Sequence, residues 1–245
     1  MVQMTSLCFP GDVVEATLVK RYKRFLVDCV LATSGEEITG HTPNTGSMKG
    51  LVSPGNRVLL SYHDSPKRKL KYSLQAIQVD ETWVGTNTML PNGFVAQLIE
   101  DANIPSLRGY ETLKREKKFG AEGKSRVDIF LSDHQAGAPD AFVEVKNVTL
   151  REGHAALFPD AVTTRGLKHI HELEYVIGQG ARGALVFLVQ RDDCTSFAPA
   201  KQIDPDYAQA LQQAYHNGLE IIVCQARVDH SGVHFYRYLE PQWDA

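Results

Sequence analysis

The sequence predicts a protein of mixed α and β structure, with a small β-barrel of the OB-fold type over residues 1–83 and an α/β domain over residues 84–245. Before residue 83, short runs rich in β-branched residues alternate with turn signals. After it, apolar residues recur at helical spacing. The charge also reverses: residues 1–72 hold ten Lys and Arg against six Asp and Glu, whereas residues 73–245 hold sixteen against twenty-three. These changes indicate two domains with different tasks.

The strands expected in the first part consist largely of Val, Leu, Ile and Thr, and residues such as Ser34-Gly35 and Pro54-Gly55 mark turns between them. These strands are Val13–Lys20, Phe25–Thr33, Glu37–His41, Val58–Tyr62 and Leu70–Val79. Short strands at this spacing are the profile of a small barrel. A fragment of a β-sandwich fits the same pattern almost as well.

The second part alternates helices and strands, which is typical of a mixed sheet covered by helices. Its first helix is expected to begin near Asn92 and to end before Pro105, because apolar residues recur at helical spacing from Phe94 to Ile99. The other expected elements are strands at Arg126–Leu131, Ala141–Val145, Ala184–Gln190, Glu220–Gln225 and Val233–Leu239, a helix over Thr164–Ile177, and a helix from Asp204-Pro205 to the stop signal Gly218.

The bulk properties fit a cytoplasmic protein. Hydrophobic residues make up 43% of the chain, but no apolar run approaches the ~18 residues that a membrane span needs, and the N-terminus lacks the pattern of a secretion signal. The cysteines Cys8, Cys29, Cys194 and Cys224 show no metal-binding spacing. No motif for a small-molecule cofactor is evident, and an oligomer is compatible with the sequence.

Two runs in the first part interleave basic and aromatic residues. They are Lys20-Arg21-Tyr22-Lys23-Arg24-Phe25 and Lys67-Arg68-Lys69-Leu70-Lys71-Tyr72. Each run alone could be a solvated turn, but two of them in one basic segment favour contacts with phosphates and stacked bases. We therefore take Lys20, Arg21, Tyr22, Lys23, Arg24, Lys67, Arg68 and Lys69 as candidate DNA contacts.

Two further segments are candidate binding surfaces. Arg165, Lys168 and His169 fall at helical spacing on one face, which could grip a DNA backbone or be a solvated face with Glu172 as an ion-pair partner. The segment 41–48 is dense in small hydrogen-bonding residues and could present donors to a phosphate, or it could be a self-bonded turn. Its candidate functional residues are His41, Asn44, Thr45 and Ser47.

The clearest candidate for chemistry is the grouping of Asp128, Glu144 and Lys146. Side chains alternate along a strand, so these three can gather on one face if Arg126–Leu131 and Ala141–Val145 pair as a hairpin. Two neighbouring carboxylates repel each other, and Mg²⁺, which favours one or two carboxylates plus phosphate and water, would relieve that repulsion. A nearby lysine can stabilise charge or help to activate water. The set suits phosphodiester cleavage, although Glu-X-Lys is also common as an exposed pair.

Several motifs resemble the sugar fermentation stimulation protein A (SfsA) family, over a region from about Val13 to about Ile222. The motifs are Gly40-His41-Thr42-Pro43-Asn44-Thr45-Gly46-Ser47-Met48, Ser125-Arg126-Val127-Asp128, Val143-Glu144-Val145-Lys146-Asn147-Val148-Thr149-Leu150, Phe158-Pro159-Asp160-Ala161-Val162-Thr163-Thr164-Arg165-Gly166 and Phe197-Ala198-Pro199. The resemblance implies a non-specific DNA-binding protein that regulates maltose metabolism in bacteria. It also implies an OB-like first domain and a second domain like the PD-(D/E)XK nucleases.

In that nuclease pattern the matching residues are Asp128, Glu144 and Lys146, with Mg²⁺ or Mn²⁺ as the implied cofactor. Asp128 here follows Val rather than Pro, a common relaxation. An acidic residue from the preceding helix often completes such sites. Glu100 is our candidate for this third metal ligand, and Glu116 is the alternative.

Three functions follow from these features. The first is a largely sequence-non-specific DNA-binding protein that regulates sugar (maltose) metabolism. The second is a Mg²⁺-dependent deoxyribonuclease that acts on single-stranded or structured DNA through Asp128, Glu144 and Lys146. A metabolite-binding protein that does not touch DNA is the third, and the charge reversal between the two parts speaks against it. The sequence does not decide between binding and catalysis.

Overall fold

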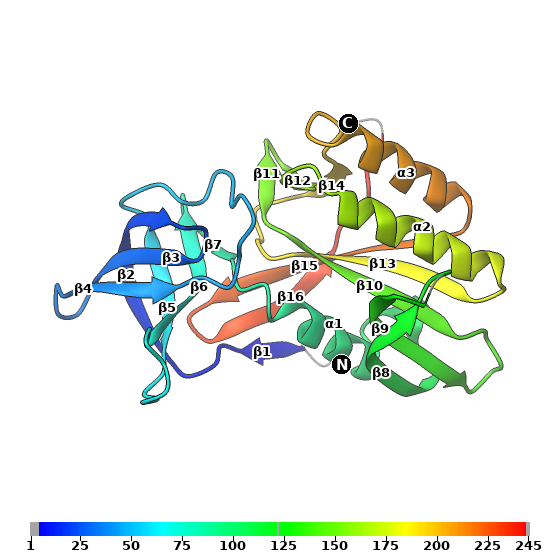
Figure 1. The fold of residues 1–245 in the computed structure, drawn as a ribbon, viewed down its shortest axis with the longest axis horizontal. Helices are drawn as coiled ribbons and strands as arrows, with labels where there is room; N and C mark the ends of the chain where they lie inside the picture. The colour runs from blue at the N-terminus through cyan, green and yellow to red at the C-terminus, as the bar shows by residue number, and fades with distance from the viewer. Residues whose placement is uncertain (1–4, 122, 244–245) are drawn as a thin grey trace.

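A computed structural model describes residues 5–121 and 123–243, so the outermost ends of the two predicted domains lie outside the described residues. Figure 1 shows a compact β structure formed by the N-terminal part, beside a larger domain in which helices cover an extended sheet. None of the described helices is long and apolar enough to cross a membrane.

The N-terminal part is a six-stranded sheet that closes on itself. The strand order is β4-β3-β2-β5-β6-β7, and β4 also pairs with β6 through His41 and Ser73. Alternation decides which side chains enter the barrel; in β3, for example, Val27, Cys29 and Leu31 are buried. The closure makes a barrel rather than a β-sandwich fragment. The strands are β2 (Asp12–Tyr22), β3 (Leu26–Leu31), β4 (Glu37–His41), β5 (Arg57–Tyr62), β6 (Tyr72–Val79) and β7 (Thr82–Gly85).

The larger domain is built on a seven-stranded mixed sheet in the order β1-β16-β15-β13-β10-β9-β8. Its three central strands, β10, β13 and β15, are parallel, and β13 is buried along almost its whole length, as expected for a strand covered on both faces. The strands are β1 (Ser6–Cys8), β8 (Tyr110–Phe119), β9 (Ser125–His134), β10 (Ala141–Val148), β13 (Arg182–Val189), β15 (Glu220–Asp229) and β16 (Gly232–Tyr238).

Helices cover both faces of this sheet. Helix α1 (Pro91–Glu100) packs into one hydrophobic cluster, whereas α2 (Thr164–Gly178) and α3 (Pro205–His216) pack into another. The starts of α2 and α3 are capped, because the side chains of Thr163 and Asp204 accept backbone N–H groups of the first turn. A short sheet of β11 (Leu150–Glu152), β12 (Ala155–Phe158) and β14 (Ser196–Pro199) completes the domain.

Two elements differ from the expectations. β8 is a strand at the edge of the sheet that is missing from the expected elements. Both of its faces are largely exposed, so it lacks the apolar alternation that reveals a strand. β1 precedes the barrel in the chain but pairs with β16 of the larger sheet. The expected boundary between residues 83 and 84 falls within β7.

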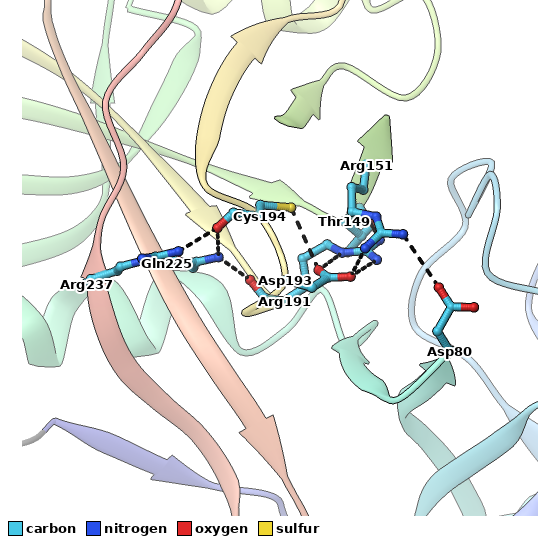
Figure 2. Close-up of polar contacts among 8 residues, drawn as sticks. All are labelled: Asp80, Thr149, Arg151, Arg191, Asp193, Cys194, Gln225 and Arg237. Carbon is cyan, nitrogen blue, oxygen red and sulfur yellow. Dashed lines mark hydrogen bonds and ion pairs between the residues drawn. The ribbon is translucent and has the colours of Figure 1, made fainter. Parts of the chain in front are cut away.

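The two parts are joined by a shared core and by ion pairs. Leu59 and Ala76 of the barrel belong to the same hydrophobic cluster as α1 and the large sheet. On the polar side of this junction, Arg151 of β11 reaches Asp80 of the barrel at 3.5 Å and also donates to Asp193 (Figure 2). The barrel is therefore held against the larger domain and is not a loosely tethered module.

Candidate active site

The candidate site lies where the ladder between β9 and β10 stops. The last paired residues of that ladder are Val143 and Ile129, so the next opposed pair in the same register is Glu144 and Asp128. There the Asp128 side chain replaces the missing backbone pairing, because its Oδ2 accepts the N–H of Val145 at 2.8 Å. The break in the hairpin thus turns Asp128 towards β10, as the sequence predicts.

Asp128 is held by two donors in a site that disfavours its charge. Its Oδ1 accepts from Nδ2 of Asn92, the second residue of α1, at 2.7 Å. Burial, followed by the negative charge of Glu144, raises the pKa of Asp128 to about 6. The carboxyl group is therefore in an environment where an added positive charge would be favourable.

Glu144 is the centre of the group, and its side chain is only 4% exposed. Its Oε1 accepts from Lys146 Nζ at 2.8 Å and from Nδ1 of His169 on α2. Burial alone would raise the pKa of Glu144, but the His169 hydrogen bond and the Lys146 charge outweigh it and hold the pKa below its usual value. Glu144 is therefore kept as a carboxylate beside Asp128.

The other oxygen of this carboxylate, Glu144 Oε2, is buried and has no hydrogen-bond partner. A buried carboxylate oxygen without a partner is unfavourable, and a divalent cation is one group that would satisfy it. Among the residues that the structure describes, no group of three or more His, Cys, Asp or Glu side chains is arranged to hold a metal ion. Mg²⁺ keeps several waters and needs only one or two carboxylates, and Asp128 and Glu144 supply two.

The third predicted ligand, Glu100, is wrong. Asn92 at the start of α1 contacts Asp128, whereas Glu100 is exposed at the other end of this helix, about 12 Å further along its axis at 1.5 Å per residue. The alternative, Glu116, lies between Arg115 and Lys117, which pair with Ile129 and Val127, so the register places it across from Asp128. Its side chain is exposed and its backbone is left-handed, with φ 57°.

Helix α2 does not present Arg165, Lys168 and His169 as one surface. His169 is buried against Glu144, whereas Lys168 is exposed and pairs with Glu172 at 3.5 Å. Arg165 is exposed, and its Nε lies 3.5 Å from Nε2 of His169. Sequence reasoning therefore missed His169 as a member of the site. The signal was weak, because one histidine on an amphipathic helix reads equally well as surface or core.

The segment 41–48 is a self-bonded turn that also reaches the second domain. Asn44 Oδ1 accepts the Gly46 N–H at 2.8 Å, as the turn alternative predicts. Ser47 Oγ donates to Asp160 Oδ2 at 2.7 Å, across the junction. The turn thus lies over the boundary between the two domains, beside a cavity of about 100 Å³ that Asn44, Gly46 and Asp160 help to line.

Arg21 holds this turn in place, which differs from its predicted role as a DNA contact. Its guanidinium donates to backbone carbonyl oxygens of Arg24, Asn44, Gly46 and Ser47. Such donors are occupied within the fold and are not free for a phosphate. Of the remaining predicted residues in the turn, His41 ends β4 and Thr45 is exposed.

The other members of the two basic runs differ in how constrained they are. Lys20 pairs with Asp28 at 3.4 Å, and Tyr22 donates to the same carboxylate at 3.2 Å. Lys23 and Arg24 form the turn between β2 and β3, where both backbones are left-handed. The exposed members of the two runs are Lys20, Lys23, Arg24, Phe25, Lys67, Arg68, Lys69 and Lys71.

Known proteins share this sequence and architecture. Residues 89–232 match the sugar fermentation stimulation protein RE domain, and residues 19–86 match the SfsA N-terminal OB domain. A sugar fermentation stimulation protein homolog of Geotalea uraniireducens is 47% identical over 91% of this chain and 94% of the relative. The homolog of Sinorhizobium medicae is 46% identical over 90% of each chain.

A solved structure agrees with these relatives. The structure of Pyrococcus furiosus SfsA in complex with Ca²⁺ superposes with a TM-score of 0.85 at 26% identity, covering 98% of this chain and 100% of that one. The OB domain and the family resemblance predicted from the motifs are confirmed. The chain belongs to the sugar fermentation stimulation protein (SfsA) family.

Proposed function

We propose that this protein binds DNA without strong sequence preference and hydrolyses phosphodiester bonds at Asp128, Glu144 and Lys146 with a divalent cation. The observation that carries the proposal is the meeting of two neighbouring carboxylates and a lysine where β9 and β10 separate, with Glu144 Oε2 left without a partner. Asp128 and Glu144 would hold Mg²⁺ or Mn²⁺. When bound, the metal would neutralise phosphate charge and lower the pKa of a coordinated water.

The protein's own residues would orient and neutralise the substrate. Lys146 Nζ, 2.8 Å from Glu144 Oε1, would donate to a phosphate oxygen and balance the charge that develops on it. His169 would fix the rotamer of Glu144 through the same oxygen, Oε1, so that Oε2 stays available to the cation. Asn92 would do the same for Asp128.

Two comparisons support the proposal. The Pyrococcus furiosus relative was solved with Ca²⁺, an oxygen-seeking cation that often occupies carboxylate sites. The motifs of this chain also resemble the PD-(D/E)XK nucleases, and its mixed sheet, with helices on both faces and the acidic residues on adjoining strands, is compatible with that architecture.

The direct test is cleavage of labelled single-stranded, nicked and branched DNA with Mg²⁺, Mn²⁺ or EDTA. We expect metal-dependent cleavage that falls by at least about 100-fold in Glu144→Gln, because a single essential electrostatic group contributes this much. Glu172→Gln is the matched control: Glu172 Oε2 is also buried without a partner, but Glu172 Oε1 accepts from Ser125 and pairs with Lys168 rather than with Lys146 and His169. No cleavage by the wild type, or equal loss in the control, would overturn hydrolysis at this site.

A second candidate function is DNA binding without cleavage, in the regulation of sugar (maltose) metabolism that the family resemblance implies. It is favoured because the site is already partly occupied by the protein's own contacts: Glu144 Oε1 accepts from Lys146 and from His169. Gel-shift titration in EDTA tests it: Lys23→Ala with Arg24→Ala should weaken binding and flatten its salt dependence. DNA binding by the wild type together with no cleavage in any metal would support this candidate. No DNA binding by the wild type would contradict it.

A further inference from the structure

A groove lies along the junction between the two domains. Its inner part is the cavity of about 100 Å³ beneath the 41–48 turn, lined also by Asn147, the residue after Lys146. Its outer part has a volume of about 600 Å³. Both parts are lined by Leu150 and Leu157, so they adjoin each other at these two residues.

The outer part carries cations from both sides of the junction. Lys49 comes from the barrel, and Lys201 comes from the connection between β14 and α3. Arg151 lines the same space, but its guanidinium is paired with Asp193 and Asp80. Glu152 is the one acidic residue of the described lining. The two exposed lysines are thus placed to contact an anion that lies in the groove.

Two unusually exposed apolar side chains lie close in sequence to residues that line the inner part. Met89 is 75% exposed and Val162 is 74% exposed, whereas the next large hydrophobic residue, Phe25, is 44% exposed. Met89 follows Thr88, which lines the cavity, and Val162 lies two residues after Asp160, which lines it from the other domain. The two residues stand just before helices α1 and α2, which deliver Asn92 and His169 to the site.

We infer that this junction groove binds a single strand of nucleic acid, with phosphates at Lys49 and Lys201 and unpaired bases against Met89 and Val162. Apolar side chains reach the base faces of an unpaired strand directly, whereas in a duplex they must first unstack the bases, and cations contact the backbone of any nucleic acid. The inference rests on the proposed function, since it names where the backbone and bases of the DNA would bind. It also selects unpaired DNA over duplex DNA as the substrate class.

Fluorescence anisotropy with a labelled oligonucleotide in EDTA tests the phosphate contacts and the base contacts separately. For Lys49→Ala with Lys201→Ala, the negative slope of log K against log salt should become shallower by about 1.4. Each lost phosphate contact with a single strand accounts for about 0.7 of this change. For Met89→Ala with Val162→Ala, single-strand affinity should fall about tenfold while duplex affinity and the salt slope stay unchanged. Arg227→Ala, at an exposed cation paired with Asp192 and outside the groove, is the matched control.

The outcomes separate this inference from the proposed function. All of these side chains are exposed, so thermal unfolding should confirm intact folds in every variant. If the wild type binds oligonucleotides and both double variants bind them equally well, the groove is overturned while hydrolysis at Glu144 stands. A loss at Met89 and Val162 that is the same for duplex and single strands would overturn the contact with unpaired bases. If the wild type binds no nucleic acid, the proposed function itself fails.

Discussion

Two buried charge clusters lie in the larger domain, and they treat their charges in opposite ways. The Glu144 cluster consists of Asp128, Glu144, Lys146 and His169, and the Arg191 cluster consists of Arg151, Arg191, Asp193, Gln225 and Arg237 (Figure 2). The side chains of Glu144 and Arg191 are equally buried, at 4% exposure. Burial alone therefore does not separate a site from a structural element.

The Arg191 cluster is saturated. Arg191 grips both oxygens of Asp193, at 2.7 and 2.8 Å, and donates to the carbonyl of Thr149 at 2.9 Å. Burial opposes ionisation of Asp193, but the hydrogen bonds and charge of Arg191 hold its pKa below the usual value. Among the described residues, no buried side-chain nitrogen or oxygen of this cluster lacks a partner.

The Glu144 cluster is incomplete. It contains a carboxylate oxygen without a partner and an aspartate whose pKa is raised to about 6. Unfavourable electrostatics of this kind persist where function requires them. The comparison teaches that satisfied charge networks join the elements of this fold, whereas the unsatisfied one marks the place prepared for an ion or a substrate.

The largest effect on stability is expected at the saturated cluster. Asp193→Asn leaves the buried Arg191 without its counter-ion, so the free energy of unfolding should fall by about 3–5 kcal/mol in urea titration. Asp192→Asn is the control, since its partner Arg227 is 53% exposed and such pairs contribute no more than about 1 kcal/mol. Similar small losses in both variants would show that the Arg191 cluster does not hold the domain together.

A smaller effect should appear in the pH dependence of metal-free protein. Because the pKa of Asp128 is raised to about 6, its stabilising contribution is present below the unfolded pKa and is lost as pH rises through about 6. From about pH 5 to about pH 7.5, the wild type should lose about 1 kcal/mol of unfolding free energy more than Asp128→Asn. Parallel curves for the two proteins, measured by urea titration at each pH, would contradict this assignment.

Replacing Glu144 of the incomplete cluster by glutamine should have little effect on the stability of the fold. Glu144→Gln keeps an oxygen that can accept from His169 and Lys146 and removes the repulsion with Asp128, and Lys146 can extend its flexible stem towards water. The free energy of unfolding should therefore change by less than about 1 kcal/mol, far less than for Asp193→Asn. A loss as large as that of Asp193→Asn in the same urea series would make Glu144 a structural residue.

The smallest effect on stability is expected at Asp80, which pairs with Arg151 of the Arg191 cluster. Asp80 is 76% exposed and lies 3.5 Å from Arg151 across the domain junction. Asp80→Ala should lower the free energy of unfolding by no more than about 0.5 kcal/mol, because solvent screens such pairs. A loss above about 2 kcal/mol in thermal or urea unfolding would show that this ion pair, rather than the shared core, joins the domains.

Much of the fold could be predicted from the sequence because its elements carry strong local signals. Each of the five strands expected in the barrel overlaps an observed strand, and the cap at Asp204 fixed the start of α3. β8 was missed because an exposed edge strand has no apolar alternation. The pairing of β1 with β16 joins residues more than 200 positions apart, which no local pattern encodes.

The site was predicted only where strand alternation controls it. Asp128, Glu144 and Lys146 follow from the period of two along paired strands. Glu100 failed because its place depends on which end of α1 meets the sheet. His169 and Lys168 diverge because adjacent helical residues point about 100° apart, so only one of them can face Glu144. Arg21 was misassigned because backbone carbonyls, which hold it, leave no sequence signature.

The most direct test of the account is calorimetric titration of Mn²⁺ and Ca²⁺ into the metal-free wild type, Glu144→Gln and Asp80→Ala. If the incomplete cluster is the prepared site, the wild type and Asp80→Ala should bind the cation with the same affinity. Glu144→Gln should bind at least about tenfold more weakly, a loss of about 1.4 kcal/mol. Equal binding by Glu144→Gln and the wild type, or no binding by the wild type, would contradict the account.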